Sequence, residues 1–199
     1  VNFVGFGLNL LDADNDGNLD AFAANGHIFE RPKRQGTTYA ERAFLLWNDG
    51  TGRFVERACG PAGAREFVGR GSAVADYDND GDLDVAVSNS GGPLQLLRND
   101  GGKGRWAGVQ LVGRRSNRQG IGARLVAETP AGKKRTRLVV AGNSYLSSSD
   151  PRVVFGLGDE NSIARLTIYW PSGTVQTVES LAAGKYLRIE ETESPTPKP

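Results

Sequence analysis

The sequence contains two nearly identical nine-residue segments, DADNDGNLD at residues 12–20 and DYDNDGDLD at residues 76–84. Each places a carboxylate at its first, third, fifth and ninth positions and a glycine at its sixth. Four negative charges this close together repel one another unless a cation neutralises them. Hard carboxylate oxygens around a sharp turn that glycine permits suit Ca²⁺. The two segments therefore predict two calcium-binding loops.

The predicted ligands are carboxylate side chains and one backbone carbonyl oxygen in each loop. They are the side chains of Asp12, Asp14, Asp16 and Asp20 with the carbonyl of Asn18, and the side chains of Asp76, Asp78, Asp80 and Asp84 with the carbonyl of Asp82. The alternative is a pair of acidic hairpin turns that hold no ion. A turn of that kind needs only one or two Asp or Asn residues, which favours the calcium interpretation.

An EF-hand opens with the same pattern, but it closes with a bidentate Glu at the twelfth position between two helices. Here the twelfth position is Ala23 or Val87. Around the second loop, Leu83, Val85 and Val87 alternate with small or polar residues at the period of a β-strand. The loops are therefore predicted to connect β-strands rather than helices.

A second pair of matching segments follows the Asp loops. Asn-Asp-Gly occurs at residues 48–50 and 99–101, and a strand-like run precedes each turn, at residues 44–47 and 94–97. Asn-Asp-Gly between apolar runs is typical of a tight β-turn. One repeat is therefore predicted to be a four-stranded antiparallel blade with a calcium loop between its first two strands. Residues 26–39 are predicted to form an additional surface loop of the first repeat.

The pattern changes near Trp106. Apolar stretches separated by Gly, Pro, Asn and Ser clusters then predict six strands, at residues 106–112, 124–128, 136–141, 152–155, 164–170 and 185–190. Short strands at this spacing suggest a β-sandwich. The chain is thus expected to be all-β, with two blades at residues 1–104 (about 1–60 and 61–104), a β-sandwich at 105–191 and a Pro-rich tail at 192–199.

The Asp loops in their blade context resemble FG-GAP or VCBS repeats, the calcium-binding blades of integrin-type β-propellers. The second half is similar to an ASPIC/UnbV domain in the stretches SNRQGIGAR, GNSYLSSSD, FGLG and WPSG, which begin at residues 116, 142, 155 and 170. The resemblance extends from about Gly5 to Glu190. It implies two integrin-type β-propeller-like blades followed by a β-sandwich, in a secreted calcium-binding interaction protein without catalytic residues to transfer.

The composition is that of an ordinary globular protein, with 38% hydrophobic and 24% charged residues in a chain of 199. No apolar run is long enough to cross a bilayer, so no membrane insertion is expected. Cys59 is the only cysteine, which excludes an internal disulfide. Loops built from carboxylates suit modules that use the millimolar Ca²⁺ found outside cells. We therefore expect a secreted or cell-surface protein.

The sequence offers little for catalysis. His27 is the only histidine and has no Ser or Cys motif nearby, and GIGA at residues 120–123 lacks the third glycine and the helix of a phosphate-binding loop. The clustered carboxylates are committed to metal, and coordinated carboxylates are poor proton shuttles. We therefore predict that the chain is not an enzyme.

The two halves of the chain differ in charge. Residues 1–104 contain 10 Lys and Arg against 15 Asp and Glu, whereas residues 105–199 contain 14 against 8. Nine of the fifteen acidic residues lie in the two Asp loops. The acidity of the first half is therefore explained by metal binding and does not predict a surface for basic partners.

Basic residues cluster twice in the second half, at residues 114–118 (RRSNR) and at Lys133, Lys134, Arg135 and Arg137. A solvated hairpin face is one interpretation of the second cluster, and a contact site for an anionic glycan is the other. Nucleic acid is disfavoured because no aromatic residues interleave with these cations to stack on bases. The polar side chains of the loop at residues 144–150 are predicted to make hydrogen bonds that stabilise the turn. The alternative is that they form a rim that contacts a ligand.

These patterns predict an extracellular protein for adhesion, scaffolding or assembly, in which Ca²⁺ rigidifies the blade loops. A carbohydrate-binding module for an anionic polysaccharide is the alternative. Two blades cannot close a propeller, so the sheet faces that carry Phe22, Leu46, Val85 and Val87 are expected to need a partner surface. We expect other protein chains there, in a homo-oligomer or open array, with the tail at residues 192–199 in the contact.

Overall fold

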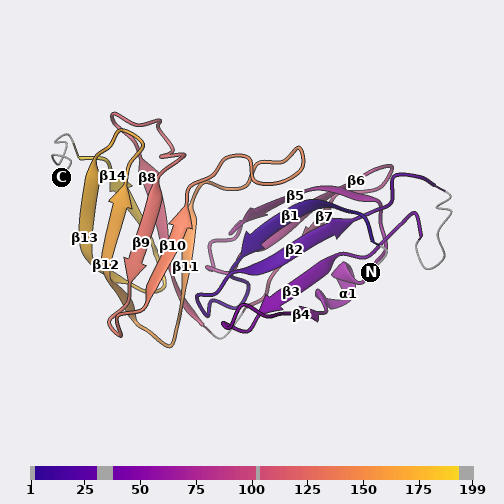
Figure 1. The fold of residues 1–199 in the computed structure, drawn as a ribbon, viewed down its shortest axis with the longest axis horizontal. Helices are drawn as coiled ribbons and strands as arrows, with labels where there is room; N and C mark the ends of the chain where they lie inside the picture. The colour runs from indigo at the N-terminus through magenta and orange to yellow at the C-terminus, as the bar shows by residue number, and fades with distance from the viewer. Residues whose placement is uncertain (1–2, 31–37, 102–103, 193–199) are drawn as a thin grey trace.

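The first repeat forms the four-stranded sheet that its Asp loop and Asn-Asp-Gly turn predict. The computed structural model describes residues 3–30, 38–101 and 104–192, and it shows two lobes of β-strands (Figure 1). Buried and exposed side chains alternate along β1 from Gly7 to Leu11, as expected for a strand with one covered face. The antiparallel sheet has the order β1-β2-β3-β4, with β1 (Gly5–Leu11), β2 (Asp20–Asn25), β3 (Phe44–Asn48) and β4 (Phe54–Arg57).

The second repeat has three strands in its sheet, so the prediction of a fourth strand is wrong. Its order is β5-β6-β7, with β5 (Gly69–Ala75), β6 (Asp84–Asn89) and β7 (Gln95–Leu97). The next strand along the chain, β8 (Arg105–Val112), joins the second lobe instead. There the side chains of Ala107, Val109 and Leu111 are buried in the lobe's core, which the edge of β7 could not offer them.

The two blades pack face to face. Phe22 of β2 and Val85 and Val87 of β6 are at most 5% exposed and belong to one apolar cluster. Three of the four residues expected to face outward therefore cover one another, and the expectation that they need a partner is wrong. Leu46, the fourth, does lie on the outer face of the first blade, because the strand register aligns it with Ala21 and Leu10.

The second lobe is a β-sandwich. Its four-stranded sheet has the order β10-β9-β12-β13, and its three-stranded sheet, which contains one parallel pair, has the order β11-β8-β14. The strands are β9 (Arg124–Glu128), β10 (Lys134–Leu138), β11 (Val153–Gly158), β12 (Ser162–Tyr169), β13 (Val175–Ala182) and β14 (Tyr186–Glu190). The sequence pattern did not predict β13, because this strand buries only Leu181 and so carries little hydrophobic alternation.

Both sheets of the sandwich contribute to a single core. Leu125, Leu166 and Ile168 from one sheet pack against Val109 and Phe155 from the other, and all five are fully buried. Interdigitation of two inner faces is the arrangement that makes a sandwich stable.

Glu191 closes the end of the sandwich. Its carboxylate accepts hydrogen bonds from the backbone N–H groups of Arg114, Arg115 and Ser116, at 2.8 to 2.9 Å, and from the hydroxyl of Ser172. Burial acts to raise the pKa of Glu191, but these donors outweigh it and lower the pKa to about 2. The carboxylate therefore serves as a buried anchor, which the backbone of residues 114–116 holds in place.

A long connection between β10 and β11 reaches from the sandwich to the second blade (Figure 1). It runs along the edge of β5, where Asp150 donates its backbone N–H to the carbonyl of Val74 at 2.9 Å and Ser149 Oγ accepts the N–H of Val74 at 3.0 Å. The polar loop at residues 144–150 therefore supplies missing hydrogen-bond partners to an edge strand. Hydrogen bonds within the loop are present as well, from Ser147 Oγ to the carbonyl of Tyr145 and from Ser149 Oγ to Asn143 Oδ1, both at 2.9 Å, so the predicted turn-stabilising bonds are confirmed.

The only helix in the described part of the chain is the single turn α1 (Gly60–Gly63). No helix there has the length and apolar character needed to cross a membrane. Residues 31–37 of the predicted surface loop and residues 193–199 of the predicted tail lie outside the described residues.

Candidate metal centres

Each Asp loop connects the first two strands of its blade and turns through the same two backbone conformations. The fourth position, Asn15 or Asn79, has φ of 59° or 63°, and the sixth, Gly17 or Gly81, has φ of 98° or 93°. Asn tolerates the left-handed region better than most residues, and glycine has no Cβ to oppose it. The repeated sequence thus produces a repeated backbone, which folds the carboxylates inward.

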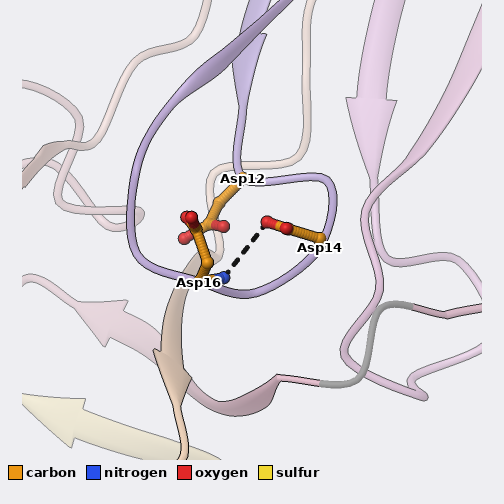
Figure 2. A group of neighbouring side chains, drawn as sticks. All are labelled: Asp12, Asp14 and Asp16. Carbon is orange, nitrogen blue, oxygen red and sulfur yellow. Dashed lines mark hydrogen bonds between the residues drawn. The ribbon is translucent and has the colours of Figure 1, made fainter. Parts of the chain in front are cut away.

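In the first loop, carboxylate oxygens of Asp12, Asp14 and Asp16 lie within 4.8 Å of one another. Figure 2 shows these side chains converging on the interior of the loop, with the backbone N–H of Asp16 donating to Asp14 at 3.3 Å. Asp12 is 1% exposed, and its Oδ1 atom accepts no hydrogen bond from any described residue. An unpartnered buried carboxylate oxygen is costly unless a cation satisfies it.

The second loop repeats this arrangement. Oxygens of Asp76, Asp78 and Asp84 lie within 4.8 Å of one another. Asp76 is also 1% exposed, and its Oδ1 atom likewise has no hydrogen-bond donor among the described residues. The equivalent buried oxygen therefore has no hydrogen-bond donor among the described residues in either repeat. Because the feature recurs in both loops, it indicates a role in binding a ligand.

The ninth-position carboxylates have a second role that the sequence analysis missed. Asp20 accepts the backbone N–H groups of Ala13 and Asn48, at 2.9 and 2.8 Å. Asp84 accepts those of Tyr77 and Asn99, at 3.3 and 2.8 Å. Each carboxylate thus ties its loop to the Asn-Asp-Gly turn of the same blade. The sequence could have indicated this contact between loop and turn, because the Asp loop and the Asn-Asp-Gly turn occur together in both repeats.

The remaining predicted ligands lie on the same loops. Asp16 accepts both the backbone N–H and the side-chain amide of Asn18, at 2.7 and 2.8 Å. Asp80 accepts the backbone N–H of Asp82 at 2.9 Å. Asn18, Asp20, Asp80 and Asp82 are outside the two groups of converging oxygens. Coordination of a metal stays a prediction for these four and for the six residues that do converge.

The two loops also contact each other. The side-chain amide of Asn15 donates to the carbonyl of Gly81 at 3.2 Å and to the carboxylate of Asp82 at 2.8 Å. The amide of Asn99 donates to the carbonyl of Ala13 at 2.8 Å. The two loops therefore lie next to each other at the end of the blades that faces the sandwich.

Arg135 and Arg137 of the sandwich cover the first loop, so the prediction that they belong to a surface basic patch is corrected. Arg135 donates to the carbonyl of Asp16 at 2.9 Å, and Arg137 donates to Asp12 Oδ2 at 3.2 Å and to the carbonyl of Gly17 at 3.3 Å. Arg135 is 9% exposed and the side chain of Arg137 is 13% exposed. Lys133 and Lys134 remain exposed, and contact with an anionic glycan stays a prediction for them alone.

The second loop is covered in a parallel way by Arg152 and Tyr186. Arg152 donates to the carbonyl of Asp76 at 2.6 Å and to the side-chain oxygen of Asn79 at 2.5 Å. The hydroxyl of Tyr186 donates to Asp76 Oδ2 at 2.6 Å. None of the sequence patterns marked these two residues, because a single Arg and a single Tyr have no local signature.

The electrostatics of the first loop favour an added cation. Burial raises the pKa of Asp12 to about 6, even though the charge of Arg137 and the backbone of Gly17 act to lower it, while Asp16 and Asp14 raise it further. Burial also raises the pKa of Asp20 in the first loop and that of Asp84 in the second. Burial and the neighbouring carboxylates thus disfavour the ionised form of these groups, and a bound divalent ion would favour it.

Both halves of the chain match families of known proteins. A family model described as an FG-GAP-like repeat matches residues 12–87, and a model described as ASPIC and UnbV matches residues 113–196. The chain is 32% identical to cartilage acidic protein 1 of Homo sapiens over 188 residues, which is 90% of this chain and 27% of that protein. It is 30% identical to the Xenopus tropicalis protein of the same name over 181 residues, 87% of this chain and 26% of that protein. The chain spans about a quarter of the length of these curated relatives.

Proposed function

Since the chain joins an FG-GAP-like repeat to an ASPIC and UnbV domain, we propose that it is an extracellular calcium-binding module for protein–protein assembly and not an enzyme. The observation that carries the calcium assignment is the pair of buried, unpartnered Oδ1 atoms of Asp12 and Asp76. Each lies beside converging carboxylates, and an all-oxygen set of this kind suits Ca²⁺. The extracellular setting is supported by the chemistry of the loops, because carboxylate loops of modest affinity work in millimolar Ca²⁺.

Asp12, Asp14 and Asp16 would hold one ion, and Asp76, Asp78 and Asp84 the other. A bound Ca²⁺ would neutralise the carboxylates and fix the loop backbones. Because both loops meet each other and the sandwich, fixing them would rigidify the junction of the two lobes. That rigidity is the function that the site supports best, since the described residues bring together no nucleophile, base and orienting group of the kind hydrolysis needs.

Isothermal titration calorimetry tests the assignment. The wild-type chain is expected to bind two Ca²⁺, while Asp16→Ala and Asp78→Ala are each expected to bind one, because each variant removes a converging carboxylate from one loop. Glu66→Ala, which removes an exposed carboxylate outside the loops, serves as the control and should bind two. A wild-type chain that takes up no Ca²⁺ at millimolar concentration would refute the assignment.

We further propose that the chain associates with copies of itself through the outer face of the first blade. Leu8 and Leu10 of β1 are 55% and 58% exposed, and the register places Leu46 in the same row as Leu10. Phe54, 48% exposed, points to this face as well, because it pairs with Asn48 on β3. A sheet face of this kind normally packs against another apolar layer.

Light scattering in Ca²⁺ tests the association. The wild-type chain is expected to be larger than a monomer, and the double variant Leu8→Glu/Leu10→Glu is expected to be monomeric, because a buried charge opposes the contact. Leu94→Glu changes a leucine that is 71% exposed on the other blade and should leave the size unchanged. A monodisperse wild-type monomer would contradict the proposal.

A further inference from the structure

The sandwich donates a hydrogen bond to the first Asp of each loop. Asp12 Oδ2 accepts a hydrogen bond from Arg137 at 3.2 Å, and Asp76 Oδ2 accepts one from Tyr186 at 2.6 Å. In the second loop the backbone N–H of Gly81 also donates to Asp76 Oδ2, at 3.0 Å, and in the first loop the backbone of Gly17 contributes a hydrogen bond to Asp12. In both loops the opposite oxygen, Oδ1, is buried and unpartnered. The carboxylate is therefore held by one oxygen with the other left for the ion.

Tyr186 is itself held in place. Its ring packs at 5.2 Å from the indole of Trp106, and the guanidinium of Arg152 lies 4.5 Å from the ring centre. Tyr186 also pairs with Gly108 in the parallel β14–β8 ladder, and a side chain at Gly108 would collide with the tyrosine ring. A phenol fixed on three sides can orient the carboxylate to which it donates.

We propose that Tyr186 is a positioning residue of the second calcium site, through which the sandwich sets the affinity of a blade loop for Ca²⁺. This inference rests on the proposed calcium binding. Groups that orient a metal ligand through its second oxygen commonly change metal affinity by about 10- to 100-fold when removed. Tyr186 allows a simpler test of positioning than Arg137 does, because the tyrosine carries no charge that would itself act on the cation. Arg137 orients Asp12 but also repels a cation, so its removal has two opposing effects on affinity.

The test isolates each loop. In the Asp16→Ala background only the second loop remains intact, and Tyr186→Phe is expected to weaken its Ca²⁺ affinity about tenfold by calorimetry. In the Asp78→Ala background only the first loop remains intact, and the same substitution is expected to leave its affinity unchanged. A general loosening of the junction would weaken both loops, so the selectivity separates positioning from a structural role.

Tyr169→Phe is the matched control. Tyr169 lies in the same lobe on β12 and also has an arginine, Arg124, 3.7 Å from its ring centre, but it contacts neither loop. It should change the affinity of neither site. Equal Ca²⁺ affinity of Asp16→Ala with and without Tyr186→Phe would overturn the inference, as would equal weakening of both loops. If the Asp16→Ala parent itself bound no Ca²⁺, the calcium assignment would fail instead.

Discussion

The midpoint of thermal unfolding is expected to be about 10 to 20 °C higher in 10 mM Ca²⁺ than in EDTA. A ligand present at 100 times its dissociation constant stabilises the folded state by about 2.7 kcal/mol, and a dissociation constant of about 0.1 mM is reasonable for an extracellular module. Two sites then contribute about 5 kcal/mol, and each kcal/mol shifts the midpoint by roughly 2 to 4 °C in a chain of this size. The loops gain this much because a bound Ca²⁺ would relieve the repulsion between their converging carboxylates.

Variants that disable one loop should show how much each loop contributes to the calcium-dependent rise in the unfolding midpoint. Asp16→Ala and Asp78→Ala should each lose about half of the calcium-dependent rise, and the double variant should lose all of it. Mg²⁺ at the same concentration should raise the midpoint less, because it demands near-ideal octahedral geometry and gives up its water reluctantly. Differential scanning calorimetry measures all of these midpoints. Identical wild-type midpoints in EDTA and in Ca²⁺ would show that the loops hold no calcium.

Arg137→Met is expected to destabilise the chain in EDTA by about 3 to 5 kcal/mol. Asp12 and Arg137 form a buried pair, with side-chain exposures of 0% and 13%, and removing one partner leaves an uncompensated charge. Methionine keeps most of the volume of the arginine stem, so the loss reports mainly the charge and its hydrogen bonds. Urea unfolding followed by circular dichroism in EDTA measures the effect.

The same variant should recover part of its stability in Ca²⁺, because a bound ion would supply positive charge to Asp12. Arg137→Met is therefore expected to gain more from Ca²⁺ than the wild type gains. Lys134→Met removes a positive charge from an exposed position on the same strand and should change stability by less than about 0.5 kcal/mol. Equal destabilisation by the two substitutions would contradict the role assigned to Arg137.

Local patterns in the sequence were enough to predict the loops and most of the strands. Alternation at period two identified β6, and like-charge repulsion within nine residues identified the converging carboxylates of Asp12, Asp14 and Asp16. These signals act between neighbours along the chain, and they do not depend on what packs against the segment. The missed strand β13 confirms the point, because a strand that buries only Leu181 leaves almost no local pattern.

The tertiary structure alone decided what covers each face and each charge. Alternation showed that Val85 and Val87 share a face, but only the packing of the two sheets showed that Phe22 covers it. Arg135 and Arg137 belong to a Lys- and Arg-rich segment that looks like a solvated surface, yet they bind a loop about 120 residues earlier in the chain. The turn after β7 matches the turn after β3, but β8 leaves the blade because the sandwich core buries its apolar face. A sequence lists the groups that need partners, and the docking of sheets that are distant along the chain determines which partners they find.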